Sequence, residues 1–313
     1  MPQHLTKRKR KIHTTLHHRV AELTPFTFSY YTIACERHPE RNEDSLLIDA
    51  TGGLVAVFDG VGGSAAGEIA SRTAARAARQ HWRHQLSQIQ RGRKRYSVLE
   101  YNENLNLHQT LEHLIQEADE LVRTEGALKA GTDDLATTVA MAALYHHPNN
   151  HTYQLVHAHV GDSRIYLLRE GESLQRLTND DGLLAKLVEN QMLAEQDALH
   201  IDQAMTAEEL SETEFTYFRH RGGITQALGG PLAPVIHIDE TTIAPGDRVL
   251  LCTDGIHDNL TDAEIEDILR NVPRTTAARI LVECSLARSH QDRSMTIRAK
   301  PDDMSAIVLT CRF

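Results

Sequence analysis

The sequence has few cysteines, no long apolar run and no excess of positive charge. Its four cysteines lie far apart without a CxxC pair, and three fall in apolar segments, which indicates buried thiols rather than disulfides or a zinc site. No apolar stretch reaches the ~18 residues of a membrane-spanning helix, and no apolar region follows the basic start as in a secretory signal. The formal net charge of −10 argues against general nucleic-acid binding. We therefore expect a cytoplasmic protein that binds neither membranes nor nucleic acid.

Strand-like and helical patterns alternate along the 313 residues. Strands are predicted at 26–34, 45–50, 54–58, 136–145, 153–162, 164–177, 245–255 and 305–313. Helices are predicted at 64–84, 107–122, 182–222 and 276–289, with one more after Thr261. Three strand-like runs in close succession predict an antiparallel meander, and strands kept apart from paired helices predict an α+β fold. We expect a flexible basic arm at 1–25 and a folded domain at 26–313.

The glycine-rich stretch VAVFDGVGGSAAGE, at 55–68, follows a predicted strand and opens a predicted helix. It satisfies a loose dinucleotide-binding fingerprint at Gly60, Gly62 and Ala65. That interpretation is disfavoured because 85–106 lacks the second buried strand that it needs, and because Asp59 would repel a pyrophosphate. The lysine of a phosphate-binding P-loop is missing too, since Glu68 takes its place. The carboxylate at the end of this strand needs another explanation.

Acidic residues follow apolar runs at several places along the chain. These segments are NED at 42–44, FDG at 58–60, VGDSR at 160–164, CTDG at 252–255 and PDDMS at 301–305. Four carboxylates within about 5 Å would repel one another by roughly 3 kcal/mol per pair, which in total exceeds the ~5–15 kcal/mol stability of a typical domain. Such a cluster requires cations, and hard oxygen ligands favour Mg²⁺ or Mn²⁺. We therefore interpret Asp59 as a metal ligand, with a phosphate bound through the metal.

Seven motifs stand in order along the chain: RNEDS, VFDGVGGSAAGEIAS, VGDSRIYLL, QRLTND, ITQALGG, PGDRVLLCTDGI and DDMSAIVL. In this order they resemble the motif series of the metal-dependent serine/threonine protein phosphatases (PPM type, protein phosphatase 2C), over about residues 27–313. The resemblance implies a four-layer α-β-β-α sandwich, with two antiparallel sheets face to face and a pair of helices on each outer side. It also implies a centre of two Mn²⁺ or Mg²⁺ ions at one end of the sandwich.

The resemblance assigns the metal ligands position by position. Asp59 would bridge the two metals, and Gly60 would offer its backbone carbonyl. Asp254 and Asp302 would bind the first metal together with Asp59, while Glu43 would hold waters on the second. A water that bridges two such ions loses a proton near neutral pH and attacks phosphorus in line, with no covalent enzyme intermediate.

A third, weaker metal site is implied by the same resemblance, because some relatives have one. Asp162 and Asp258 match the positions that bind this metal together with Asp254. Asp44 stands beside Glu43 in the sequence and is expected close to the second metal. The cofactors implied are thus two divalent ions per site, with this third ion as a further prediction.

The arginine that grips the substrate phosphate is displaced from its usual position. The family usually has it three or four residues before the ED segment, where this chain has Pro39 and Glu40. Arg41 and Arg37 are the two candidates. We favour Arg41, and the choice between them stays open at this point.

Other positions also depart from the family pattern. Val61 stands where some relatives have a histidine that acts as a general acid. Asp181 and Gly182 replace the usual His-Ser, and Asp303 replaces the usual asparagine. None of these changes removes a metal ligand, so we expect an active enzyme.

The function implied is metal-dependent hydrolysis of phosphoserine and phosphothreonine in proteins, opposing a cognate serine/threonine kinase. We expect a monomer without a sensor or membrane anchor after the last strand. The alternative is a catalytically silent, phosphatase-like scaffold, which retention of the metal ligands disfavours. Residues 183–223 take the place of the family's flap, and both a substrate-recognition role and a plain surface insertion stay open.

Several other features are interpreted as structural rather than functional. The basic runs at 7–11 and 91–95 are expected to be solvated, and Trp82 is expected in the core. The 19 histidines, His157 and His159 among them, are interpreted as scattered surface residues rather than metal ligands.

Overall fold

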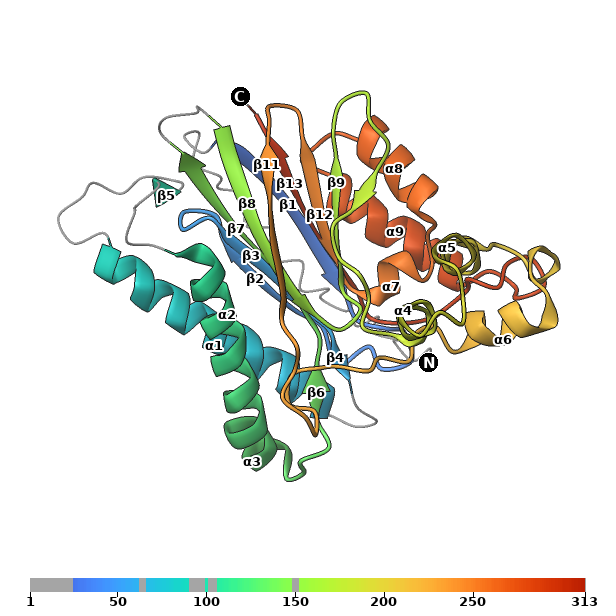
Figure 1. The fold of residues 1–313 in the computed structure, drawn as a ribbon, viewed down its shortest axis with the longest axis horizontal. Helices are drawn as coiled ribbons and strands as arrows, with labels where there is room; N and C mark the ends of the chain where they lie inside the picture. Colours follow the sequence, from blue (N-terminus) through green and yellow to red (C-terminus); the bar gives the residue numbers. More distant parts are fainter. Residues whose placement is uncertain (1–24, 62–65, 90–98, 101–105, 148–151, 313) are drawn as a thin grey trace, which may run out of the picture.

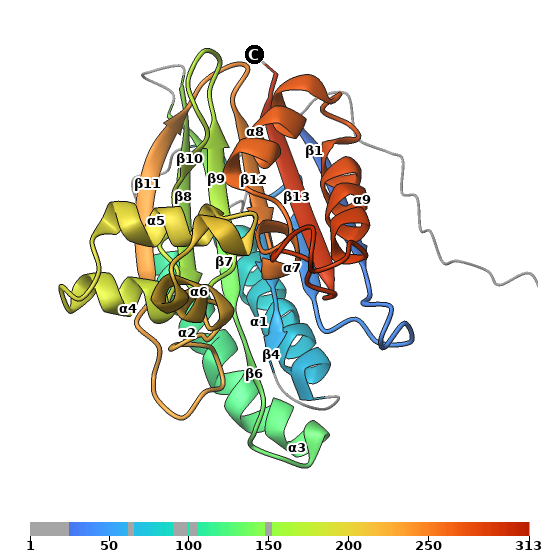
Figure 2. The same cartoon turned by 90° about the vertical axis from the view of Figure 1, so that its right-hand side faces the viewer.

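Two sheets packed face to face, with helices on both outer sides, form the body of the molecule (Figure 1, Figure 2). The computed structural model describes residues 25–61, 66–89, 99–100, 106–147 and 152–312. Among these residues, no helix combines the length and the apolar character that crossing a membrane requires. The α-β-β-α architecture predicted from the sequence is confirmed.

The sheets of the described chain are antiparallel with one local exception. The first sheet has the order β1 (Phe26–Ile33), β13 (Met304–Cys311), β12 (Arg248–Cys252), β9 (Arg164–Leu168) and β10 (Gln175–Arg176). The second has the order β11 (His237–Ile243), β8 (Thr152–Val160), β7 (Val139–His147), β3 (Leu54–Phe58) and β2 (Ser45–Asp49). The exception is β5 (Leu99–Glu100), which pairs parallel with β7. Two short strands, β4 (Gly60–Val61) and β6 (Ala136–Thr137), pair with each other beyond β3.

Three groups of buried apolar side chains separate the four layers. The first lies under α1 (Ala66–Ile89) and α2 (Leu107–Leu121) and includes the buried Trp82, as predicted. The second lies between the two sheets, and the third lies under α8 (Asp262–Asn271) and α9 (Ala277–Ser289). β3 contributes to two of them, because its side chains alternate between the helices and the facing sheet. Burial of each large apolar side chain contributes ~1.5–3 kcal/mol, so a strand buried on both faces is a rigid support for the residue that follows it.

Capping residues in the sequence determine where α2 and α8 begin. α2 begins at the first residue of the predicted helix, where the side chain of Asn106 accepts a hydrogen bond from the backbone N–H of Gln109 at 3.1 Å. The chain then continues through a π-helical turn (Val122–Gly126) into α3 (Ala127–Ala130). Thr261 and Glu264 form a reciprocal capping box at the start of α8.

The segment between β10 and β11 contains three short helices and a 3₁₀ turn, consistent with its polar helical pattern. They are α4 (Leu183–Glu189), α5 (Glu195–Gln203), the turn Ala207–Glu209 and α6 (Glu212–Arg219). Capping boxes begin both the turn, at Thr206, and α6, at Ser211. We call residues 183–223 the flap. Figure 2 shows its helices packed beside the end of the sheets near α7 (Asp254–His257).

The structure corrects three expectations. β11 was not predicted, because this edge strand is mostly exposed and its sequence HIDETTI lacks an apolar alternation. The runs 136–145 and 164–177 do not form single strands: the first splits into β6 and β7, and the second into β9 and β10. The surface interpretation of His157 and His159 is wrong, because both are buried on β8 and His159 stacks on His237 with 4.8 Å between ring centroids.

Some predictions fall outside the described residues. They concern the basic arm up to residue 24, the glycine-rich loop at 62–65, and the basic runs at 7–11 and 91–95.

Candidate metal centre

The loops at one end of the sandwich bring the predicted acidic residues together. Asp59 follows β3, and Asp254 begins α7 directly after β12 in the other sheet. Asp162 lies in the turn from β8 to β9, and Asp302 comes just before β13. Glu43 belongs to the connection from β1 to β2. All of these residues lie at strand ends along one rim of the sandwich. Residues far apart in the chain therefore share one site.

Two Asp-Gly pairs shape this rim, and both glycines are there because the backbone packs too closely for a side chain. A Cβ atom at Gly60 would lie 2.3 Å from the carbonyl oxygen of Gly67 in the first turn of α1. A Cβ atom at Gly255 would lie 1.9 Å from the carbonyl oxygen of Asp303. Real Cβ atoms do not approach backbone so closely, which explains why glycine follows the aspartate at each of these two strand ends.

Asp303 positions the loop that carries Glu43. Its Oδ1 accepts a hydrogen bond from the backbone N–H of Cys35 at 2.6 Å, and its Oδ2 accepts one from the N–H of Glu43 at 2.7 Å. An asparagine has one acceptor oxygen and could not accept from these two donors on separate oxygens, as Asp303 does. His38, Glu43 and Asp303 bring their ligand atoms within 4.8 Å, but the Asp303 oxygens are already engaged. We therefore interpret Asp303 as a positioning residue.

Burial and mutual repulsion raise the pKa values of several carboxyls in the centre. The pKa of Asp59 lies well above its ordinary value because of desolvation first, and then because of the charges of Asp254, Asp44, Asp302 and Asp162. Desolvation likewise raises the pKa of Asp162, with the charge of Asp254 as the next cause. Carboxyls that destabilise one another in this way are stabilised by a bound cation.

The donor set fits hard divalent cations. Asp44 accepts a hydrogen bond at Oδ2 from the hydroxyl of Thr253 at 2.8 Å, whereas its buried Oδ1 has no hydrogen-bond partner among the described residues. Desolvation raises the pKa of Asp44 well above its ordinary value. Oxygen donors of this kind, without thiolates and with carboxylates predominating, are those that Mg²⁺ and Mn²⁺ prefer.

The two candidate arginines differ in their place. Arg41 is half-buried, and its Nε lies 3.2 Å from Oε1 of Glu43. Arg37 is exposed. A guanidinium beside a predicted metal-binding residue is placed to bind a phosphate that reaches the same metals, so the geometry favours Arg41.

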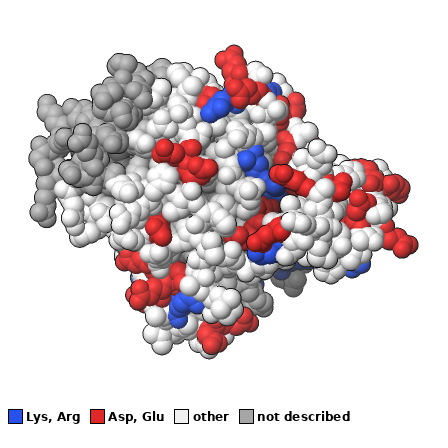
Figure 3. All heavy atoms as spheres, in the orientation of Figure 1, with Lys and Arg blue, Asp and Glu red and all other residues white. Residues whose placement is uncertain are grey.

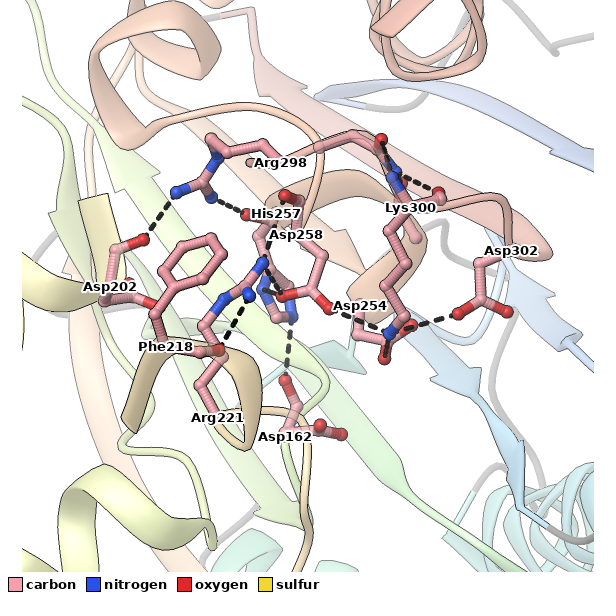
Figure 4. Close-up of polar contacts among 12 residues, drawn as sticks. Asp162, Asp202, Phe218, Arg221, Asp254, His257, Asp258, Arg298, Lys300 and Asp302 are labelled. Atoms are coloured by element: carbon pink, nitrogen blue, oxygen red, sulfur yellow. Dashed lines mark hydrogen bonds and ion pairs between the residues drawn. The ribbon is translucent and has the colours of Figure 1, made fainter. Parts of the chain in front are cut away.

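Asp258 lies in the centre but has a different charge environment. Burial alone would raise its pKa, yet Arg221, Lys300 and His257 together hold the pKa well below its ordinary value. Figure 4 shows Lys300 beside Asp254, Asp258 and Asp302, with Arg221 approaching Asp258 from the flap. Lys300 and Arg221 were not predicted as site residues, because neither belongs to a motif and each reaches its partner across some 40 positions of sequence.

Asp181 fixes the turn that holds Asp162. Its Oδ2 accepts a hydrogen bond from the N–H of Gly161 at 2.9 Å, and its Oδ1 lies 3.0 Å from Nε2 of His237. The departure from the usual His-Ser therefore has a structural role here. Beyond it, Gly182 forms an isolated bridge with Ile224, which closes the base of the flap.

The flap contains a pocket of about 600 Å³, lined by residues from α4 and from the segment after α6. Its lining includes Leu183, Lys186, His220 and Ile224. Acidic side chains gather over the end of the molecule where α5 and α6 lie (Figure 3). The first turns of the flap's helices supply several of them, including Glu195 and Glu212.

Comparison with known proteins decides the family. A family model described as protein phosphatase 2C matches residues 34–289. This chain belongs to the protein phosphatase 2C family. The resemblance predicted from its motifs is thereby confirmed.

Two sequence relatives come from bacteria. The chain is 28% identical over 269 residues to the serine/threonine protein phosphatase PstP of Mycobacterium tuberculosis, an alignment that covers 82% of this chain and 42% of PstP. It is 26% identical over 240 residues to the serine/threonine phosphatase Stp of Listeria innocua, covering 76% of this chain and 79% of Stp. The chain thus spans less than half the length of PstP.

Solved structures share the fold. The crystal structure of M. tuberculosis PstP superimposes with a TM-score of 0.67 at 23% identity, covering 92% of this chain and 99% of that one. The catalytic domain of PstP in complex with two manganese ions gives a TM-score of 0.63 at 22% identity and covers the same shares.

Proposed function

We propose that this chain hydrolyses phosphoserine and phosphothreonine in proteins with the help of two divalent metal ions. The observation that carries the proposal is the convergence of four carboxylates on Asp59. Desolvation is the largest cause of the raised pKa of Asp59, and the charges of the four carboxylates raise it further. They belong to Asp254, Asp44, Asp302 and Asp162. The names of the relatives PstP and Stp, both serine/threonine phosphatases, support it. So do the two manganese ions in the complex of the PstP catalytic domain.

The residues predicted to hold the two metals have separate proposed roles. Asp59 would contact both metals, Asp254 and Asp302 would hold the first, and Glu43 would face the second. The backbone carbonyl of Gly60 would complete this set. When bound, the metals supply an activated water nucleophile and neutralise charge on the phosphoryl group.

The phosphate would be oriented by the chain itself. Arg41 would donate hydrogen bonds to two phosphate oxygens, and Glu43 would hold the guanidinium in place through its contact with Nε. Asp303 would keep this loop against the start of β13 through its two backbone hydrogen bonds. The polypeptide around the phosphorylated residue would then lie against the flap, whose pocket opens beside α4.

The proposed substrates are proteins that a serine/threonine kinase has phosphorylated. This enzyme would oppose that kinase. We further propose that it acts as a monomer in the cytoplasm. The silent-scaffold alternative differs in two respects, since it requires neither metal binding nor turnover.

Phosphate release from phosphothreonine and phosphoserine peptides tests the proposal. We expect release with Mn²⁺ or Mg²⁺ and none after chelation, with recovery when metal is restored. A phosphotyrosine peptide of the same sequence is the matched control and should be cleaved much more slowly. No release from any peptide with either metal would favour the scaffold.

A further inference from the structure

Asp258 already has two cationic partners from the chain itself. Arg221 Nη2 lies 3.0 Å from Asp258 Oδ1, and Lys300 Nζ lies 2.8 Å from Asp258 Oδ2. The Lys300 ammonium also lies 2.5 Å from Asp254 Oδ2 and 3.1 Å from Asp302 Oδ2. An ammonium group thus occupies the point where these three carboxylates meet (Figure 4).

The backbone of Lys300 is fixed beside these carboxylates. Its N–H donates to the side-chain oxygen of Asn259 at 3.1 Å, and its carbonyl accepts from the side-chain amide of the same Asn259 at 2.9 Å. Two residues earlier, the fully buried Arg298 donates to the carbonyl oxygens of His257 and Leu260. Lys300 is therefore held against α7 and is not a stray surface lysine.

The guanidinium of Arg221 is fixed as well. It stacks over the ring of Phe218, 3.8 Å from the centroid, and Nη1 donates to the carbonyl of Phe218 at 3.0 Å. Its Nη2 also donates to the backbone carbonyl of Asp258 at 3.3 Å. Because Arg221 belongs to the flap, this contact ties the flap to the metal centre.

Asp162 provides the contrast. Asp162 and Asp258 were predicted to share a third metal, yet among the described residues Asp162 has no ion pair, whereas Asp258 has cations on both of its oxygens. A metal that bound both aspartates would have to displace Arg221 or Lys300 from Asp258.

We propose that Lys300 and Arg221 supply the positive charge at Asp258 in place of the predicted third metal ion. The chain then binds two divalent ions. Lys300 competes with the first of these ions for Asp254 and Asp302. The inference rests on the proposed two-metal centre. Binding of the first metal draws Asp254 and Asp302 away from the ammonium, which keeps Asp258 as its partner. The affinity for that metal is lowered by the competition.

Manganese binding to chelator-treated protein tests this inference without any need for turnover. Calorimetry gives the affinities, and elemental analysis after equilibrium dialysis gives the number of bound ions. We expect two ions for the wild type and for Lys300→Arg, which keeps the charge. Lys300→Met should bind the first ion at least tenfold more tightly, about 1.4 kcal/mol. The double variant Lys300→Met/Arg221→Met should bind a third ion.

Lys129→Met is the matched control, because Lys129 lies on α3, away from the centre, and pairs with Glu125. It should leave the number and affinity of bound ions unchanged. If Lys300→Met does not fold, Lys300→Gln takes its place.

Two results would overturn the inference: three ions on the wild type, or a wild-type number and affinity in both Lys300→Met and the double variant. Peptide hydrolysis in the same samples separates this outcome from failure of the proposed function. Two bound ions without phosphate release would contradict the function and leave the role of Lys300 standing. Three bound ions with phosphate release would do the reverse.

Discussion

Asp162 and Arg164 are separated by a single residue, yet they belong to two different groups of buried charge. Asp162 belongs to the candidate metal centre. Arg164 belongs to an ion network under the flap, where its Nη2 lies 2.5 Å from Asp180 Oδ2 and 2.9 Å from Asp202 Oδ1. Arg164 is 2% exposed and Asp162 is 7% exposed, so both charged groups are removed from water.

The difference lies in how the charges are compensated. In the network, burial alone would raise the pKa of Asp202, but Arg164 and Arg176 hold it well below its ordinary value. In the centre, burial and neighbouring carboxylates both raise the pKa of Asp59. Buried charges that are paired stabilise a fold's geometry, whereas buried charges of one sign that are left together require a ligand. The lack of compensating cations around Asp59, more than its burial, marks the candidate binding site.

The largest expected effect comes from removing the central carboxylate. Asp59→Asn should lower turnover of a phosphothreonine peptide at saturating Mn²⁺ by at least about 100-fold, because a charge that contacts both metals is lost. The metal-free fold should survive, since the substitution relieves repulsion from Asp254 and Asp44. Peptide kinetics and thermal melting in chelator measure the two effects. Asp133→Asn, at an exposed position, is the control. Turnover above a tenth of the wild-type value would contradict the role of Asp59.

The second prediction breaks the compensated group. Asp202→Asn should lower the free energy of unfolding by about 3–5 kcal/mol, because Arg164 loses one of its buried partners. Urea unfolding in the presence of chelator measures this without any contribution from bound metal. Asp197→Asn, exposed on the same helix α5, should change stability little. A loss below about 1 kcal/mol for Asp202→Asn would show that the network is not a structural element.

The place of the acidic residues of the candidate centre could be predicted from the sequence to a large extent. Asp59 and Asp254 each follow an apolar strand and precede a glycine, so their place at a strand end is local information. Family resemblance then ordered the other motifs around the same rim. Strands buried on both faces, such as β3, were also found because their apolar runs are continuous.

The compensating charges could not be predicted, because their partners are set by tertiary packing. Lys300 reaches Asp258 across 42 positions, and Arg164 reaches Asp202 across 38. No local pattern distinguishes such a cation from a solvated one. The buried His157 was missed for a similar reason, since one polar residue within an apolar strand does not reveal which face is covered.

The third prediction concerns a buried group that remains neutral. Burial lowers the pKa of His157 to about 4, below the ~6.5 of an exposed histidine. The folded state therefore binds fewer protons than the unfolded state between these values, and the free energy of unfolding falls as the pH drops from about 6.5 to 4, by up to about 3 kcal/mol. His157→Leu should remove this part of the pH dependence, as measured by urea unfolding at several pH values. His84→Leu, at an exposed position, should leave it in place. Parallel curves for wild type and His157→Leu would contradict the assignment.

The smallest expected effect is the gain in stability on adding Mn²⁺, which distinguishes the ion network from the candidate metal centre. Mn²⁺ binds the folded state, so a hundredfold excess over the dissociation constant should raise the free energy of unfolding by ~2.7 kcal/mol, and chelator should reverse it. Asp202→Asn should start from a lower stability and gain the same increment, because its defect lies in the network. Asp59→Asn should keep its stability in chelator and gain little from Mn²⁺, because its defect lies in the centre. Urea unfolding of the three proteins with Mn²⁺ and with chelator makes the comparison. Equal increments in all three would place the bound metal outside the rim, and a wild type indifferent to both reagents would favour the silent scaffold.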